Sequence, residues 1–144
     1  MKVFNNDSKR LVTDRKMFKI KLKTLPNINS QNRFVCTHSF SELTALCPIT
    51  KLPDFYTITI IYEPNDLLIE LKSLKLYLGE YRDSEIIHED ITNVIFQDFI
   101  EIVKPRWVQI KMQANVRGGI STIITVSWSK KNGFEIGSNQ RLDQ

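Results

Sequence analysis

The chain of 144 residues has the length of a single domain, and its 42% hydrophobic and 25% charged residues predict a compact globular fold. Its net charge of +4 is too small, by itself, to indicate a nucleic-acid-binding protein. No run of residues approaches the ~18 consecutive apolar residues that a membrane-spanning helix needs, so we expect no membrane partner.

The first part of the chain combines a polar terminus, an alternating segment and a loop. Residues 1–14 are polar and lack the apolar stretch of a signal peptide, so we expect them to be flexible. Lys16–Lys23 alternates lysine with apolar residues, which predicts a half-exposed strand. The proline and asparagines of residues 25–33 predict a loop.

The next part predicts extended chain and a hairpin. Arg33–Leu46 is expected to be extended and to end at Cys47, because the following proline disfavours helix there. Phe55–Tyr62 is rich in β-branched and aromatic residues, which is typical of a strand. Residues 63–66 predict a turn, after which we expect Leu67–Leu71 to return antiparallel to that strand.

Two helices and a second hairpin follow. Lys72–Arg82 carries apolar residues at helical spacing, and His88–Val103 repeats them at every fourth position. Trp107–Val116 alternates polar and apolar residues, as a strand with one buried face does. A turn with two glycines then leads to a second strand, Ile120–Trp128.

The order of these elements is strand, strand, helix, helix, strand, strand. This order predicts an α+β fold in which an antiparallel sheet carries two helices on one face. We expect one folded domain over residues 15–130 and a polar tail over residues 131–144.

Cys47 is a candidate nucleophile because it lies in a loop between strands, where functional residues concentrate. Asp54 follows it where the next strand begins, and a carboxylic acid beside a thiol can relay protons to a reacting nitrogen. A lone cysteine is more often a small buried residue, and that alternative stays open. Cys36 lacks such a neighbour and is expected to be structural. Without secretory features, both are expected to be reduced thiols in a cytoplasmic protein.

Charged residues suggest two further contacts. At the start of the second helix, Glu89 either stabilises the positive helix end or accepts two parallel hydrogen bonds from a planar N–H edge. Lys72 and Lys75 share one helix face, and Arg117 joins them if the fold brings its turn close. Such a group of cations suits a phosphorylated cofactor, although a solvated helix face is equally compatible. The two histidines form no zinc-binding pattern, so no metal is expected.

Four segments together resemble the single-module 7-cyano-7-deazaguanine reductases (QueF). They are Leu-Cys-Pro-Ile-Thr-Lys-Leu-Pro-Asp-Phe (46–55), Glu-Leu-Lys-Ser-Leu-Lys-Leu-Tyr (70–77), His-Glu-Asp-Ile-Thr-Asn (88–93) and Arg-Gly-Gly-Ile (117–120). The resemblance covers about residues 33–128, and the second segment is the signature of the family. It implies the tunnelling fold, with two antiparallel hairpins that flank two helices.

The resemblance also implies an activity and a set of roles. These enzymes reduce the nitrile of 7-cyano-7-deazaguanine to an aminomethyl group with two NADPH, on the route to queuosine in tRNA. Thiolate addition converts the nitrile, a poor hydride acceptor, into a thioimide that accepts hydride more readily. The implied roles are nucleophile for Cys47, proton donor for Asp54, substrate binding for Ile69, Glu70, Leu71, His88 and Glu89, and NADPH binding for Lys72, Lys75 and Arg117.

The resemblance further implies a homo-oligomer, a decamer of two five-membered rings. Active sites are then expected between subunits, with Cys47 and Glu89 contributed by different chains. Two short stretches depart from the family. Lys51 and Leu52 stand where the family usually has Gly-Gln, and Gly79-Glu80 is unusual before the following aromatic residue.

Three alternative functions are compatible with parts of this sequence. A related class of enzymes adds ammonia to the nitrile on tRNA to make archaeosine and uses no NADPH. Because Glu70–Tyr77 retains the full reductase signature, reduction is favoured. A basic RNA-binding module would not depend on Cys47 and would lose affinity steeply with salt. The pterin-handling branch of the fold, related to GTP cyclohydrolase, needs zinc ligands that are scarce here.

Overall fold

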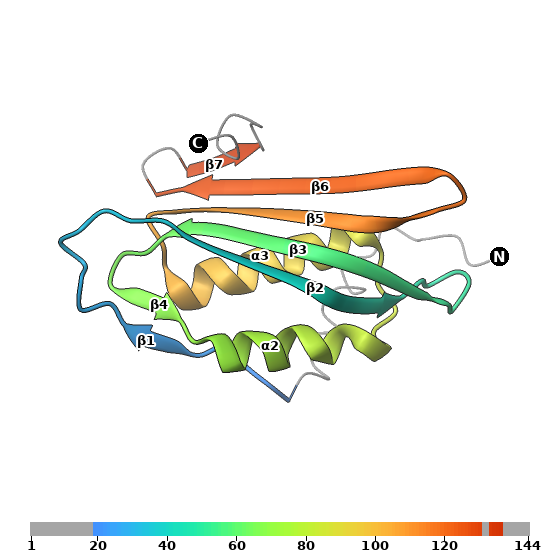
Figure 1. The fold of residues 1–144 in the computed structure, drawn as a ribbon, viewed down its shortest axis with the longest axis horizontal. Coiled ribbons are helices and arrows are strands. Elements are labelled where there is room, and N and C mark those ends of the chain that lie inside the picture. The colour runs from blue at the N-terminus through green and yellow to red at the C-terminus, as the bar shows by residue number, and fades with distance from the viewer. Residues whose placement is uncertain (1–18, 131–132, 137–144) are drawn as a thin grey trace.

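The computed structural model describes residues 19–130 and 133–136, arranged as Figure 1 shows. The helices are α2 (Leu71–Gly79), the 3-10 turn η1 (Glu80–Asp83) and α3 (His88–Val103). The long strands are β2 (Cys36–Leu46), β3 (Pro53–Glu63), β5 (Trp107–Arg117) and β6 (Ile120–Ser129). The short strands are β1 (Thr24–Pro26), β4 (Leu67–Ile69) and β7 (Gly133–Ile136).

The core lies between an antiparallel sheet and the two helices. The strands stand in the order β2-β3-β5-β6-β7, and α2 and α3 lie on the same side of the sheet (Figure 1). On the helix side, Ile58 is aligned with Met112 and Ile60 with Ile110, and all four are buried. Alternate residues of β3 therefore face the helices. The predicted α+β fold is confirmed, as are the two helices, of which α3 has the predicted bounds.

The strand β4 does not return along β3, so our prediction of a hairpin over Leu67–Leu71 is wrong. β3 already lies between β2 and β5, and therefore has no free edge for another strand. β4 pairs instead with β1, with Leu25 opposite Leu68, and Leu71 begins α2. The first two residues of the loop predicted at 25–33 thus belong to a strand.

The strand predicted over Lys16–Lys23 is also wrong within its described part, residues 19–23, which has no regular secondary structure. The alternating sequence is nevertheless reflected in which side chains are buried. The lysines of this segment are exposed, and its apolar side chains pack on the core. The segment is bonded to α2 rather than to a strand. The Lys23 N–H donates to Ser73 Oγ at 2.9 Å, and its carbonyl accepts from the Glu70 N–H at 2.9 Å.

The end of the chain differs from a simple polar tail. β7 pairs with Val126–Ser129 of β6, a pairing that its sequence did not indicate. The flexibility expected for residues 1–14 concerns a segment outside the described residues. Within the described part, no helix is long and apolar enough to cross a membrane.

We predict that Ser73→Ala releases the segment before β1. Ser73 is 4% exposed, and its hydroxyl accepts from Lys23 while donating to the Glu70 carbonyl at 2.8 Å. Loss of the acceptor should lower the free energy of unfolding by about 1 kcal/mol and accelerate hydrogen exchange at the Lys23 amide. The exposed control Ser121→Ala should change neither quantity. Unchanged exchange at Lys23 would show that another contact holds the segment.

Candidate functional site

A cavity of about 320 Å³ lies at the end of the sheet where the β2–β3 loop, the β5–β6 turn and the start of α3 meet. The β2–β3 loop and the β5–β6 turn lie at the same end of the sheet in Figure 1. The side chains that line the cavity include Cys47, Asp54, His88, Glu89, Arg117 and Thr122. Five of them are predicted site residues, so the fold brings together residues far apart in the sequence.

A tight loop holds Cys47 at the edge of this cavity. The Cys47 N–H donates to the Leu52 carbonyl at 2.9 Å, and its carbonyl accepts from the Lys51 N–H at 2.9 Å. Lys51 has a φ of 62°, a left-handed conformation that glycine adopts most readily. The side chain of Lys51 forms an ion pair with Glu85. This ion pair ties the loop to the segment that precedes α3.

The same preceding segment is paired to the end of β2. The Leu46 N–H donates to the Ser84 carbonyl at 2.8 Å, and the Leu46 carbonyl accepts from the Ile86 N–H at 3.1 Å. These two bonds form a parallel bridge between Leu46 and Glu85. The residue after Leu46 is therefore fixed beside the first turn of α3.

The environment of Cys47 favours its thiolate. The pKa of Cys47 is lowered from the ordinary thiol value, first by the backbone N–H of Thr50 and then by the Thr50 hydroxyl. Burial and the charge of Asp54 act in the opposite direction and are outweighed. A thiolate is the nucleophilic form of cysteine. The cysteine thus has the protonation behaviour that a nucleophile needs.

Asp54 is buried and is held by an arginine from β5. Arg117 Nη1 donates to Asp54 Oδ1 at 2.9 Å and to the Pro53 carbonyl at 2.8 Å. Arg117 precedes Gly118 and Gly119, whose φ values of 58° and 79° make the β5–β6 turn. A turn of this kind needs positive φ and so favours glycine. The turn sequence therefore places the guanidinium above the end of β3.

The first turn of α3 contributes a histidine and a carboxylate. Glu89 is exposed in this turn, where a negative charge is favourable. His88 Nδ1 lies 2.5 Å from the hydroxyl of Tyr56, and the two rings meet edge to face with centroids 5.2 Å apart. Tyr56 is not among the predicted site residues, because its sequence position is typical of a core aromatic in a strand. Its position two residues after Asp54, on the same face of the strand, could have indicated that it lies near the site.

The substrate-binding residues predicted around Glu70 lie elsewhere. The Glu70 carboxylate caps α2, accepting from the N–H groups of Ser73 at 2.7 Å and Lys72 at 2.8 Å. These backbone bonds, that of Ser73 first, lower the pKa of Glu70. Ile69 is buried, and Leu71 is 55% exposed. In one chain, this group does not line the cavity that contains Cys47.

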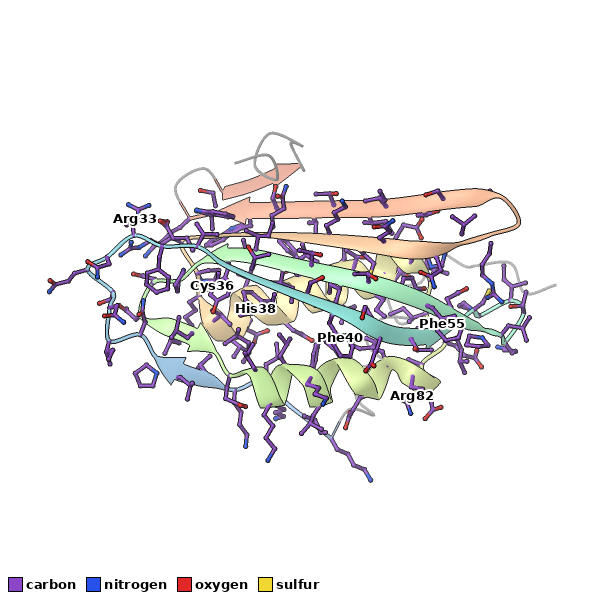
Figure 2. All side chains as sticks on the ribbon, viewed as in Figure 1. Arg33, Cys36, His38, Phe40, Phe55 and Arg82 are labelled. Atoms are coloured by element: carbon purple, nitrogen blue, oxygen red, sulfur yellow. The ribbon has the colours of Figure 1, made fainter. Side chains whose placement is uncertain are left out.

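The two groups lie at opposite ends of β3. The Ile69 N–H donates to Tyr62 Oη at 3.1 Å, whereas Asp54 lies near the other end of that strand. At about 3.3 Å per residue, Asp54 and Tyr62 are ~26 Å apart. Cys36 also lies far from the cavity: Figure 2 shows it toward the end of the sheet opposite Phe55.

The three cations expected to bind NADPH do not meet in one chain. Lys72 and Lys75 lie exposed on α2, and neither forms an ion pair within the described residues. Arg117 is instead engaged with Asp54 at the cavity. The expectation that Cys47 and Glu89 come from different chains is wrong, because one chain supplies both to one cavity. Within the described residues, no group of three or more His, Cys, Asp or Glu could hold a metal ion.

Comparison with known proteins identifies the family. Residues 53–133 match the family described as QueF-like protein, which is more than half of the chain. The chain belongs to the QueF-like family. A relative of this family member, from Prochlorococcus marinus (strain NATL2A), is named NADPH-dependent 7-cyano-7-deazaguanine reductase. The two are 42% identical over 111 residues, which are 77% of this chain and 79% of the relative.

Other relatives of the QueF-like chain carry the same name. The protein from Chlorobaculum tepidum is 51% identical over 89 residues, 62% of this chain and 76% of that one. A solved structure, an archaeosine synthase described as QueF-Like in the apo form, aligns with a TM-score of 0.61. It is 19% identical and covers 65% of this chain and 91% of that chain. At this identity the likeness shows the fold alone, and it agrees with the tunnelling fold implied by the sequence motifs.

We predict that Lys51→Gly is more stable than Lys51→Ala by about 1 kcal/mol in the free energy of unfolding. Both variants lose the ion pair with Glu85, but only glycine relieves the left-handed strain at φ 62°. Chemical denaturation measures the difference. The neighbouring pair Leu52→Gly and Leu52→Ala is the control, and glycine should not be the better residue there. Equal stability of the two Lys51 variants would contradict the argument from strain.

Proposed function

We propose that this protein reduces the nitrile of 7-cyano-7-deazaguanine to an aminomethyl group with two NADPH, in the route to queuosine. Membership of the QueF-like family and the names of its relatives support this reaction. The observation that carries the mechanism is Cys47, whose pKa is lowered and which shares a cavity with Asp54 and Glu89.

In the first step, the Cys47 thiolate attacks the nitrile carbon. A carbon–sulfur bond forms, one π bond of the nitrile breaks, and its electron pair moves to nitrogen. Asp54 lines the same cavity and is placed to relay to this nitrogen the proton that the Cys47 thiol gives up. The product is a covalent thioimide on Cys47.

The later steps return Cys47 to its starting form. When bound, NADPH supplies the hydride that each of the two reductions adds to the former nitrile carbon. Between the reductions, the carbon–sulfur bond breaks and Cys47 leaves with the electron pair as thiolate. The nitrogen gains two protons overall, and Asp54 is the group placed to relay them to it. Arg117 holds the Asp54 carboxyl at the edge of the cavity throughout.

The base of the substrate is proposed to lie against the first turn of α3. A carboxylate accepts two parallel hydrogen bonds from adjacent N–H groups, and the deazaguanine base presents such an edge. Glu89 is the exposed carboxylate of that turn. Because Glu89 and Cys47 line one cavity, both ends of a planar base can be held at the same time.

We further propose that a neighbouring subunit completes the site. Ile69, Glu70 and Leu71, expected to bind substrate, lie ~26 Å along the sheet from the cavity of their own chain. Lys72 and Lys75 stand on the same helix, exposed and without ion pairs among the described residues, as phosphate-binding cations would. A homo-oligomer, proposed as two rings of five, would bring them to the cavity of the next chain, with Arg117 beside them.

A cytoplasmic location is part of this proposal. Cys36 and Cys47 are both free thiols, and Cys47 must stay reduced to act as a nucleophile. Thiols are kept reduced in the cytosol, which also holds the NADPH that the reaction consumes.

We predict that Cys47→Ala abolishes covalent adduct formation and turnover, whereas Cys36→Ala leaves both largely intact. Only Cys47 lines the cavity and has the lowered pKa. Mass spectrometry with 7-cyano-7-deazaguanine alone detects the adduct, and absorbance at 340 nm follows NADPH oxidation, which should require the nitrile. Because its pKa is lowered, Cys47 should react with iodoacetamide to a lower pH than an ordinary thiol does. Equal loss of turnover in both variants, with folding preserved, would remove Cys47 as the single nucleophile.

We predict that mixed oligomers of Cys47→Ala and Lys72→Ala chains recover activity, although neither variant alone reaches more than a small fraction of wild-type turnover. A site between chains can combine an intact Cys47 with an intact Lys72. Mixed Cys47→Ala and Glu89→Ala chains are the control and should not recover, because both residues line one chain's cavity. Subunit exchange is verified by native mass spectrometry. A fully active monomer would overturn the proposed assembly.

A further inference from the structure

Tyr56 lies behind His88, one of the residues that form the wall of the cavity. It lies on β3 two residues beyond Asp54, is 1% exposed, and does not itself line the cavity. Its hydroxyl lies 2.5 Å from His88 Nδ1, and its ring meets the imidazole at 80°. Among the described residues, this hydroxyl is hydrogen-bonded to His88. The contact therefore acts on a residue that does line the cavity.

The Tyr56 hydroxyl can supply the hydrogen between these two atoms. Burial raises the pKa of Tyr56 well above its ordinary value. The nearby negative charges of Asp54, Cys47 and Glu89 raise it further, in that order. Arg117 opposes them and is outweighed. At neutral pH the phenol is thus protonated and can donate to the unprotonated nitrogen of a neutral imidazole.

We infer that Tyr56 is a positioning residue that holds His88 as the Nε2–H tautomer and aims this N–H into the cavity. A neutral imidazole carries one donor and one acceptor, so a donor placed at Nδ1 leaves the hydrogen on Nε2. Because Nδ1 faces the buried Tyr56, the Nε2 edge is the one available to a ligand. The ring contact fixes the plane of the imidazole as well.

The inference deepens the proposed function and rests on it for the identity of the ligand. The N–H edge of a deazaguanine base, proposed to bind Glu89, is flanked by a carbonyl oxygen. That oxygen needs a donor, and Nε2–H of the adjacent His88 is one. With the opposite tautomer, Nε2 would meet the carbonyl as a second acceptor, which is repulsive. Tyr56 therefore selects bases that carry an oxo group beside the N–H edge.

The tautomer can be tested without any ligand. The chain contains two histidines, His38 and His88, so the ¹⁵N NMR spectrum of histidine-labelled protein is simple. A His38→Gln variant assigns the signals. In the wild type, His88 should show a protonated Nε2 and an unprotonated Nδ1. In Tyr56→Phe the signals should shift toward a mixture of tautomers. Wild-type signals in Tyr56→Phe would overturn the inference whether or not the proposed reaction occurs.

The effect on substrate binding provides a second test. Tyr56→Phe should raise the KM for 7-cyano-7-deazaguanine about tenfold, while covalent adduct still forms at saturating nitrile. Tyr81→Phe is the matched control, because Tyr81 is also 1% exposed and its hydroxyl bonds Tyr77 Oη at 2.8 Å, outside the cavity. It should leave the KM unchanged. Wild-type protein that forms no adduct would defeat the proposed function, and leave the tautomer result standing.

A double-mutant cycle separates positioning from a general structural effect. If Tyr56 acts through the imidazole, Tyr56→Phe should raise KM in the wild type but have no further effect in a His88→Ala background. Thermal unfolding of each variant verifies that it is folded. Additive effects on KM would show that Tyr56 does not act through His88, and would overturn the assignment.

Discussion

The site depends on two backbone hydrogen bonds made by Leu46, the last residue of β2. Leu46 donates to Ser84 and accepts from Ile86, which joins the sheet to the segment that enters α3. Backbone bonds fix the relative position of two segments without using side chains, so Cys47 and His88 remain free for chemistry. The half-exposed ion pair between Lys51 and Glu85 adds little energy to this junction and serves mainly to direct the loop.

The cavity is the polar continuation of the hydrophobic core. Along the helix side of β3, buried isoleucines are followed toward the cavity by Tyr56 and then Asp54. A buried carboxylate requires a partner, and Arg117 of β5 supplies one. A buried phenol likewise requires one, and His88 supplies it. These polar groups are therefore oriented by the need of every buried polar group for a partner, which leaves Cys47, Glu89 and one edge of the histidine open to the cavity.

The sequence predicted what local periodicity encodes and missed what depends on strand pairing. The spacing of apolar residues within His88–Val103 fits only a helix, and α3 has the bounds that it predicted. Leu67–Leu71 looked like a returning strand, but both edges of β3 are already occupied, one by the preceding strand β2 and the other by β5. The candidate site residues came from motifs, because composition cannot distinguish Cys47 from a buried structural cysteine. Tyr56 was not predicted because a tyrosine in a strand usually packs in a core, as this one does, and its hydrogen bond to His88 depends on the tertiary fold.

The proposed assembly follows from the positions of the two groups of predicted site residues in one chain. Each chain carries Cys47 at one end of β3 and the start of α2 near the other, so an interface that brings these two together joins unlike surfaces. Contacts of this head-to-tail kind produce an open filament unless the rotation closes a ring. The edges of the sheet suggest where such contacts form. Within the described residues β2 has a free edge, and β7 covers β6 only at Val126–Ser129. The uncovered part of β6 begins at Ile120, which lines the cavity, so a strand pairing there would bring a neighbour's residues directly to Cys47.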